Sequence, residues 1–346
     1  MLNMSISVAQ QFAPSIENIE PLGNGYINDT YLVSTSTKPF VVQKINKHVF
    51  TNPEQIMANL EVLNQHIVQA NNPQITLKIP RLLQTQSQQN YFRDEQDDCW
   101  RALTYIENSE SLEAIRNLAD AEQVGLALGQ FHRLTRMLDA EKLHDTLPGF
   151  HITPGYLRHY KQVKSSTKIP EDVFCADFIA RYQSINNDLE MAKEQGLLTT
   201  YVIHGDPKLN NFLFDKDTRK IISIIDLDTV KPGLIHYDIG DCLRSCCHDT
   251  ITDQFNLEVC RALLTCYLEE MGELFSGNDY QFVYPAIRLI PFELGIRFYT
   301  DYLEGNRYFK VTEPEENLRR ALGQFRLCAN IIAQESDIKG IIKQLA

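Results

Sequence analysis

The chain has 346 residues, of which 43% are hydrophobic, and it carries 45 acidic and 33 basic residues for a formal net charge of −12. This length is sufficient for two lobes, each with its own core. The acidic balance, without a run of lysine and arginine, argues against a nucleic-acid partner, which requires a surface that neutralises phosphates.

The N-terminal residues and the cysteines predict where the protein resides. The segment MLNMSISVAQQF lacks the basic and apolar regions of a signal peptide, and no apolar run approaches the roughly 20 residues that cross a bilayer. The dense cluster Cys242, Cys246, Cys247 and His248 matches no common zinc spacing, so we interpret it as part of a buried helix rather than a zinc or redox site. We therefore expect a reduced, cytoplasmic protein without a membrane segment.

The first hundred or so residues favour strands with one helix. Extended segments are predicted within 19–33, on either side of a glycine turn, and at 40–45, 79–83 and 99–106. Asn52 followed by Pro53 is typical of a helix start. Apolar residues then recur at the spacing of one helical face, at Ile56, Leu60, Leu63 and Ile67.

Beyond residue 108 the pattern changes to helices. Residues 120–138 combine an Asp cap with an apolar stripe, and His132 in this helix is expected to pack rather than to bind a ligand. Further helices are predicted at about 171–195, 238–247, 254–273, 282–304 and 315–336, interrupted by a strand-rich insert at 201–226. We therefore predict an α+β protein with a β-rich N-terminal lobe (1–107) and a mainly α-helical C-terminal lobe (108–346).

The insert has the pattern of a β-hairpin. Apolar runs at 212–214 and 221–225 flank the polar turn 215–220. Counting outward from this turn places Asn211 and Asp226 opposite each other at the open end of the hairpin, where directly opposed residues lie about 5 Å apart.

Two oxygen-bearing side chains at this position suit a hard cation. Magnesium takes few protein ligands and relies on phosphates and water for the rest, so Asn211 and Asp226 are candidate ligands. Asp206 precedes the hairpin on the same loop, where a carboxylate can orient or accept the proton of an attacking hydroxyl. The sequence therefore predicts a phosphoryl-transfer site.

The motif that starts at His204, H-G-D-x-x-x-x-N, resembles the catalytic loop of aminoglycoside and choline kinases, and Ile225-Asp226 resembles their metal-binding segment. This resemblance implies a two-lobe protein-kinase-like fold, with a nucleotide-binding N-terminal lobe, a catalytic C-terminal lobe, and ATP and Mg²⁺ as cofactors. It also implies Asp206 as catalytic base, Asn211 and Asp226 as magnesium ligands, and His204 as a structural member of the loop.

Several longer segments resemble one subfamily, the bacterial N-acetylhexosamine 1-kinases, which phosphorylate the anomeric hydroxyl of GlcNAc or GalNAc. They are LGNGYINDTYLV, QKIN, KLNN, IIDLDTVKPG, YDIGD and GIRFYTDYLEGNRYF. The resemblance implies a small-molecule substrate, a sugar. One alternative is the same fold acting on homoserine, choline, ethanolamine or an aminoglycoside. The other is a non-catalytic kinase-like binding protein, which would be expected to lack one of the three residues Asp206, Asn211 and Asp226.

Gly23, Asn24 and Gly25 lie between two predicted strands. They therefore form neither a dinucleotide-binding fingerprint, which opens a helix, nor a P-loop. At the start of a β-rich lobe they predict a loop whose backbone N–H groups cover phosphates. The residues expected beside it are Tyr26, Ile27, Asn28 and Thr30.

The strand at 40–45 lies where a kinase carries its phosphate-binding lysine. Lys44 is the obvious cation, but the kinase pattern of three apolar residues before the lysine places Gln43 in that slot. Because neighbours on a strand point to opposite faces, only one of them faces the nucleotide. Glu61, on the following helix, is the candidate to orient that side chain. The linker expected to bind adenine through its backbone contains Tyr105 and Glu107.

The acceptor site is predicted from polar residues near Asp206 and within 295–309. Sugars are held by polar side chains above an aromatic surface, and arginine and tyrosine supply both. Besides Asp206, the candidates are Lys208, Asp228, Arg244, Arg297, Asp301, Tyr302 and Tyr308. Asp228 is placed either to bind a sugar hydroxyl or to hold its loop, and Asp238 is predicted to brace the catalytic loop.

Overall fold

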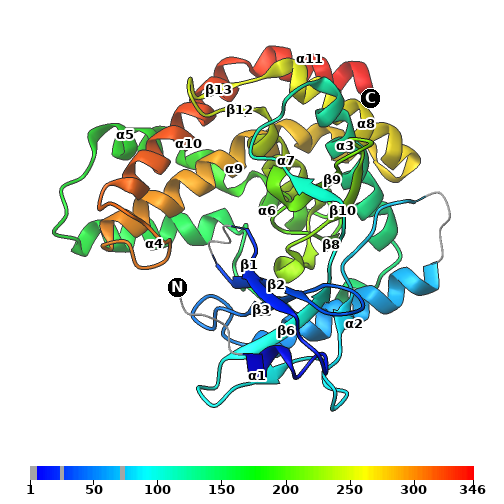
Figure 1. Cartoon of the computed structure of the whole chain (residues 1–346). Helices are drawn as coiled ribbons and strands as arrows, with labels where there is room; N and C mark the ends of the chain where they lie inside the picture. The colour runs from blue at the N-terminus through cyan, green and yellow to red at the C-terminus, as the bar shows by residue number, and fades with distance from the viewer. Residues whose placement is uncertain (1–5, 24–26, 71–74) are drawn as a thin grey trace.

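The computed structural model describes residues 6–23, 27–70 and 75–346, and Figure 1 shows a strand-rich N-terminal part beneath a larger helical part. The N-terminal sheet is antiparallel, in the order β1-β2-β3-β6-β4, and β5 also pairs with β6. Its strands are β1 (Asn18–Pro21), β2 (Asp29–Ser34), β3 (Phe40–Lys44), β4 (Leu82–Leu83), β5 (Phe92–Arg93) and β6 (Cys99–Thr104). The strands predicted for this part are therefore present, most of them shorter than expected.

The sheet has two different faces because side chains alternate along each strand. Val42, Trp100 and Ala102 pack in a hydrophobic cluster with the short helix α1 (Ile6–Ala9). Gln43 and Arg101, their neighbours along β3 and β6, are paired across the two strands and point to the opposite face. That second face is directed toward the helical part, where Arg101 reaches Asp228.

Helix α2 (Pro53–Ala70) begins where Asn52 and Pro53 predicted a start, and its apolar face packs into the main core. Asn59 on this helix is buried and donates hydrogen bonds to the main-chain oxygens of His144 and Val230, both at 2.9 Å. Its side-chain oxygen accepts from the His144 N–H at 2.8 Å. The helix is thus attached to the C-terminal part by hydrogen bonds as well as by packing.

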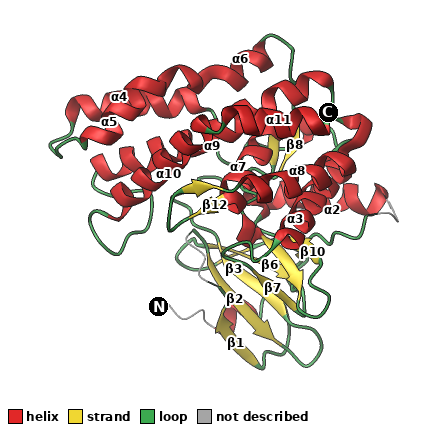
Figure 2. Cartoon of the chain, turned by 90° about the horizontal axis from the view of Figure 1, so that it is seen from above, coloured by secondary structure: helices red, strands yellow, loops and turns green. Residues whose placement is uncertain are grey.

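The C-terminal part consists of helices around two small sheets and a short hairpin, and Figure 2 shows it to one side of strands β1–β3 and β6. Its helices are α3 (Leu118–Thr135), α4 (Thr153–Ser166), α5 (Val173–Tyr182), α6 (Asp188–Glu194), α7 (Ile235–Cys247), α8 (Leu257–Met271), α9 (Gly277–Leu303), α10 (Glu316–Ala333) and α11 (Glu335–Leu345). Its strands are β7 (Ser109–Ser111), β8 (Tyr201–Ile203), β9 (Phe212–Asp215), β10 (Ile221–Ile224), β11 (Lys231–Gly233), β12 (His248–Asp249) and β13 (Gln254–Phe255).

Several helix boundaries differ from those predicted. Helix α3 starts two residues before Asp120, because Asn117 is the cap and its side chain accepts from the Asp120 N–H. The single helix expected at 171–195 is divided into α5 and α6 by a 3₁₀ turn at Gln183–Asn187, where asparagine side chains compete for backbone hydrogen bonds. Helices α4 and α11 were not predicted.

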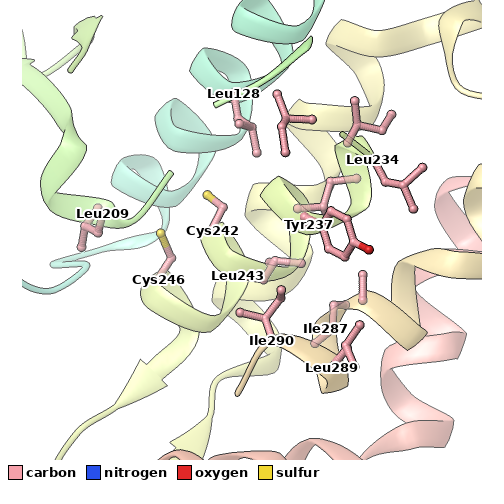
Figure 3. Packing of buried hydrophobic residues seen from close by; sticks show 14 of the residues in the cluster. Leu128, Leu209, Leu234, Tyr237, Cys242, Leu243, Cys246, Ile287, Leu289 and Ile290 are labelled. Carbon is pink, nitrogen blue, oxygen red and sulfur yellow. The ribbon is translucent and has the colours of Figure 1, made fainter. Parts of the chain in front are cut away.

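The core of the C-terminal part surrounds α7. Figure 3 shows Cys242 and Cys246 on this helix among apolar side chains that include Leu128 and Leu209. Burial raises the pKa of the Cys242 thiol, which therefore stays protonated and acts as a small apolar group. Helices α7 and α9 approach closely at Gly240, where a Cβ atom would lie 2.7 Å from the Ala286 main-chain oxygen. This packing fixes α7 beneath the loop that precedes β9.

None of the helices in the described parts of the chain has the length and apolar character needed to cross a membrane.

Candidate active site

The loop between β8 and β9 carries the polar residues of the predicted motif. The Lys208 ammonium lies 2.6 Å from the Asp206 carboxylate and 4.0 Å from that of Asp226. The Asn211 side chain donates to the main-chain oxygen of Asp206 at 2.7 Å. The side chains of Asp206 and Asp226 are 26% and 40% exposed, so both remain accessible to a ligand. The structure therefore brings the motif residues together in one open site.

The hairpin has the predicted turn, but its register differs by one residue. Phe212 pairs with Ile224, and the Ile225 N–H donates to the Asn211 main-chain oxygen at 2.9 Å, so Asn211 lies opposite Ile225. The predicted direct pairing of Asn211 with Asp226 is wrong because the pairing of Ile221 with Phe214 centres the turn between residues 217 and 218, one residue earlier than predicted. A bulge between residues 221 and 223 of β10 then moves the partner of Asn211 from Ile224 to Ile225. Asp226 has the left-handed φ of 65°, which turns the chain at the end of β10.

The donor atoms at this position fit a magnesium ion. The Asn211 amide nitrogen is bound to Asp206, so its oxygen is the atom left to coordinate. The only partner that the described residues offer the Asp226 carboxylate is Lys208, at 4.0 Å. An amide oxygen and a carboxylate are hard ligands that leave coordination positions for phosphates and water. When bound, magnesium would neutralise charge on the transferring phosphoryl group.

The two carboxylates of the site differ in their acidity. Burial raises the pKa of Asp226 to about 6 against the opposing charge of Lys208, and the neighbouring charges of Asp228 and Asp206 raise it further. Burial also raises the pKa of Asp206, but the charge and hydrogen bond of Lys208 outweigh this effect and hold it below the usual range. Asp206 is therefore ionised at neutral pH, as a hydrogen-bond acceptor for an attacking hydroxyl must be.

The catalytic loop is braced from below by Asp238 on α7. This buried carboxylate accepts from the N–H groups of His204 at 2.7 Å and of Gly205 at 2.8 Å, and it is 3.0 Å from the His132 ring. Burial raises the pKa of Asp238, but its hydrogen bonds with His132 and the His204 N–H and the charges of the two histidines together outweigh this effect, so the pKa is lowered. His132 thus takes part in the support of the loop, beyond the packing role predicted for it.

His204 is itself buried and supports the loop from within. Its ring accepts from the Asp206 N–H at 3.3 Å and donates to the Ile225 main-chain oxygen at 2.9 Å, which connects the loop to the metal-binding segment. Burial lowers the pKa of His204, so the ring is neutral with its proton on Nε2. Gly205 has a φ of +86°, and a Cβ atom there would lie 2.6 Å from the Thr229 main-chain oxygen.

A second buried pair, His151 just before α4 and Glu293 on α9, supports the same loop. The His151 ring lies 2.6 Å from the Gly205 main-chain oxygen and 3.1 Å from the Glu293 carboxylate, which also accepts from the Thr153 hydroxyl at 2.7 Å. Burial lowers the pKa of His151, but the charge and hydrogen bond of Glu293, with smaller contributions from Asp241 and Gly205, together outweigh this effect and the pKa is raised. This pair could not be recognised in the sequence because its members are 142 positions apart.

On the N-terminal side, the structure distinguishes Gln43 from Lys44. The Gln43 side chain donates to the Thr30 hydroxyl at 3.1 Å and accepts from Arg101 at 2.7 Å on the face toward the catalytic loop. Lys44 is bound to Asp98 and lies 5.7 Å from the centre of the Trp100 ring, on the opposite face. Of the two alternatives that the sequence left open, Gln43 is therefore the residue on the face toward the catalytic loop.

Glu61 does not orient either of these residues. It is exposed on the outer side of α2, where it accepts from Asn90 at 2.9 Å and from Gln65 at 3.3 Å. The prediction for Glu61 is thus not supported, because rotation of α2 places Asn59, rather than Glu61, on its inner side.

Asn28 and Asp228 connect the two parts of the molecule. The Asn28 amide donates to Asp228 at 2.7 Å and accepts from the Asn46 N–H at 3.0 Å. Asp228 is buried, and its second oxygen binds Arg101. Both carboxylate oxygens are therefore occupied, which corresponds to the loop-holding alternative for Asp228 rather than to contact with an acceptor.

The other residues predicted for nucleotide binding are placed as follows. Gly23 has a φ of +68° after β1, while Asn24, Gly25 and Tyr26 lie outside the described residues. Ile27 packs at the edge of the core. Tyr105 is half-buried and Glu107 is exposed in the linker between β6 and β7.

Arg297 on α9 is surrounded by aromatic rings. Its guanidinium lies 4.9–5.9 Å from the centres of four of them, those of Phe150, Tyr156, Tyr308 and Phe309. Burial lowers the pKa of Arg297, but nearby tyrosines, Glu293 and Asp206 outweigh it and raise it. Across the described residues, no carboxylate lies within ion-pair distance of this guanidinium. Arg297 and Tyr308 therefore form a cationic, aromatic surface near Asp206.

The remaining acceptor candidates are engaged elsewhere. Asp301 is buried and accepts from the N–H groups of residues 307, 308 and 309 at 2.8–3.0 Å and from the Asn317 amide, so it holds this loop instead of facing an acceptor. Tyr302 stacks on Tyr299 at a ring separation of 6.4 Å. Arg244 is bound to Asp241 at 2.8 Å, although its charge still acts on Asp206.

The model of the family described as "Phosphotransferase enzyme family" matches residues 18–274, which is most of the chain. The chain belongs to this family. The matched segment includes both the N-terminal sheet and the loop between β8 and β9. The predicted activity class, a small-molecule phosphotransferase, is confirmed.

Solved structures similar to this phosphotransferase have its fold along almost the whole length. One is a microcompartment-associated aminopropanol kinase (TM-score 0.70, 16% identity, 97% of this chain and 99% of that chain covered). Another is an aminoglycoside phosphotransferase from Alicyclobacillus acidocaldarius (0.66, 14%, 98% and 98%). A third is an amicoumacin kinase in complex with AMP-PNP, Ca²⁺ and Ami (0.66, 13%, 99% and 96%). The predicted two-lobe kinase-like fold is therefore confirmed.

Arg101 is the residue of this phosphotransferase site that sequence reasoning missed most clearly. It is fully buried between the sheet and Asp228, yet it lies in a strand whose pattern gave no reason to single out one arginine. Its position opposite Gln43 in the pairing of β3 with β6 is what would have drawn attention to it.

Proposed function

We propose that this protein transfers the γ-phosphoryl group of Mg-ATP to a sugar hydroxyl, the C1 hydroxyl of an N-acetylhexosamine such as GlcNAc or GalNAc. The observation that carries this proposal is the open group of Asp206, Asn211 and Asp226 on one braced loop, with the aromatic-lined Arg297 beside it. The proposal includes a boundary between the two lobes after residue 107. It is supported by β7, which follows this boundary and pairs with β9 of the C-terminal part.

Each residue of the loop has a role that follows from its contacts. Asp206 is ionised and accepts the proton of the sugar hydroxyl, while its bond to Lys208 fixes the orientation of the carboxylate. Asn211 and Asp226 hold the metal, which neutralises charge on the phosphates. Lys208 lies between the carboxylates of Asp206 and Asp226, where its charge also stabilises the transferring group.

The charge beside the site favours a neutral acceptor. A cationic amine would be repelled by Arg297, which forms no ion pair with a carboxylate of the described residues. A guanidinium donates hydrogen bonds to hydroxyl and carbonyl oxygens, as the ring and acetamido groups of an N-acetylhexosamine provide. The rings of Tyr156 and Tyr308 add apolar surface for the sugar faces. The eight free cysteines agree with the proposed cytoplasmic setting, where ATP and Mg²⁺ are available.

The test is ADP release from Mg-ATP with a panel of acceptors: GlcNAc, GalNAc, galactose, glucose, homoserine, choline, aminopropanol and kanamycin. We expect turnover with an N-acetylhexosamine and a product that releases phosphate in mild acid but resists mild base. Arg297→Met should raise KM for the sugar and leave KM for ATP unchanged, with Arg326→Met on the surface of α10 as control. Turnover only with amines or amino acids would refute the sugar assignment and retain the Asp206 mechanism.

A further inference from the structure

A kinase-like site requires positive charge beside the phosphates of its nucleotide. Strand β3 does not supply it, because Lys44 is bound to Asp98 on the outer face of the sheet. The residues of β3 and β6 that alternate toward the catalytic loop are Val41, Gln43, Cys99, Arg101 and Leu103. Of these five, only Arg101 is cationic.

The guanidinium of Arg101 is held in a fixed orientation. Its Nε and Nη2 atoms donate to the Gln43 side-chain oxygen at 3.0 and 2.7 Å, and Nη2 also binds Asp228. Gln43 in turn donates to the Thr30 hydroxyl at 3.1 Å. The side chain of Arg101 is only 1% exposed, so this chain of contacts lies inside the molecule.

The third nitrogen of this guanidinium is not satisfied by the described residues. Nη1 of Arg101 is buried and has no hydrogen-bond partner among the described residues. An unpaired buried N–H group of a cation is costly and calls for a ligand that accepts hydrogen bonds. The Nε and Nη2 atoms of Arg101 are already bound to Gln43 and Asp228, so Nη1 is the nitrogen left to donate to such an acceptor.

Arg101 lies next to the metal-binding segment. Asp228, its ion-pair partner, follows Asp226 by two residues on the 3₁₀ turn Leu227–Thr229. A nucleotide phosphate held by a metal on Asp226 would therefore lie close to the same guanidinium.

We propose that Arg101 is the phosphate-binding cation of this enzyme, supplied by β6 in place of a lysine on β3. Gln43 and Asp228 are positioning residues that orient the guanidinium so that Nη1 donates to a phosphate oxygen. This inference rests on the proposed use of ATP. Gln43, the uncharged residue at the usual lysine position, then acts by orienting Arg101.

The test compares the affinities of Mg-ATP and of adenosine, measured by calorimetry, in wild type and variants. Arg101→Met should lower the affinity for Mg-ATP by about 10- to 100-fold, which corresponds to the loss of one charge-assisted hydrogen bond, and leave the affinity for adenosine unchanged. Arg101→Lys should lie between, since lysine retains the charge and loses the planar geometry. Arg93→Met is the matched control. Arg93 lies on the neighbouring strand β5, and the substitution removes its ion pair with Glu54.

Arg101→Met leaves Asp228 buried and unpaired, which can unfold the protein. The double variant Arg101→Met, Asp228→Asn removes both charges, and we expect it to fold and to show the same selective loss of Mg-ATP. An equal loss of affinity for Mg-ATP and for adenosine would overturn the proposal. An unchanged affinity for Mg-ATP in the folded double variant would also overturn it. A wild-type protein that binds adenosine and Mg-ATP equally would also overturn it, whereas one that binds neither would refute the proposed function itself.

Discussion

The support of the catalytic loop by Asp238 can be tested by one isosteric change, Asp238→Asn. The carboxylate accepts from His204 N, Gly205 N and His132 Nε2 at 2.7–3.0 Å. An amide retains one acceptor oxygen and places an NH₂ group against another donor. One buried N–H group then loses its partner, at a cost of about 1–3 kcal/mol, and the remaining bonds lose their charge.

We therefore expect Asp238→Asn to lower the free energy of unfolding by about 2–4 kcal/mol, a large part of the usual 5–15 kcal/mol. It should also lower kcat at temperatures where the variant remains folded, because the backbone on either side of Asp206 loses its anchor. Urea unfolding and steady-state kinetics measure the two effects. Asp337→Asn, on the exposed side of α11, is the control and should change stability by less than about 0.5 kcal/mol. An equally small change for Asp238→Asn would refute the reasoning.

Three further predictions concern the same loop. Asp206→Asn should lower kcat by about 10²–10⁴-fold while Mg-ATP binding, measured by calorimetry, persists; a variant that keeps most of its kcat would exclude a base role. Because Asp226 must ionise to bind metal and has a pKa of about 6, the Mg²⁺ concentration for half-maximal rate should rise as pH falls from 7.5 to 5.5, and a constant value would contradict this. Gly205→Ala should destabilise the protein by about 1–3 kcal/mol in urea unfolding and slow turnover, more than Gly196→Ala, which has a similar φ but open space around it.

The local part of the site could be predicted from the sequence. The H-G-D-x-x-x-x-N motif and the hairpin turn depend on residues close together along the chain, and they place Asp206, Asn211 and Asp226 within one loop and its hairpin. The register was wrong by one residue because the turn is centred one residue earlier than the polar run indicated, and the bulge in β10 offsets only half of the resulting shift. Alternation also showed that only one of Gln43 and Lys44 faces the nucleotide, but not which one.

The long-range part could not be predicted. The face of β3 that Lys44 occupies is decided by Trp100 and Asp98, which belong to other segments. The support of Gly205 by His151 and Glu293 joins a loop to a distant helix, and neither residue stands out in its own segment. Asp301 had the position expected of an acceptor ligand, and its use by the N–H groups of residues 307–309 became evident only from the folded chain.

Asp301 holds the segment 305–309, which carries the proposed acceptor-binding residue Tyr308, independently of the loop that carries Asp206. A single carboxylate organises the loop that carries Tyr308 and Phe309, while Asp238 on α7 and His151 just before α4 support the phosphoryl-transfer loop. Substitutions in the 305–309 segment can therefore accumulate without disturbing Asp206. This arrangement would let relatives of this protein exchange one acceptor for another during evolution while the chemistry of phosphate transfer stays the same.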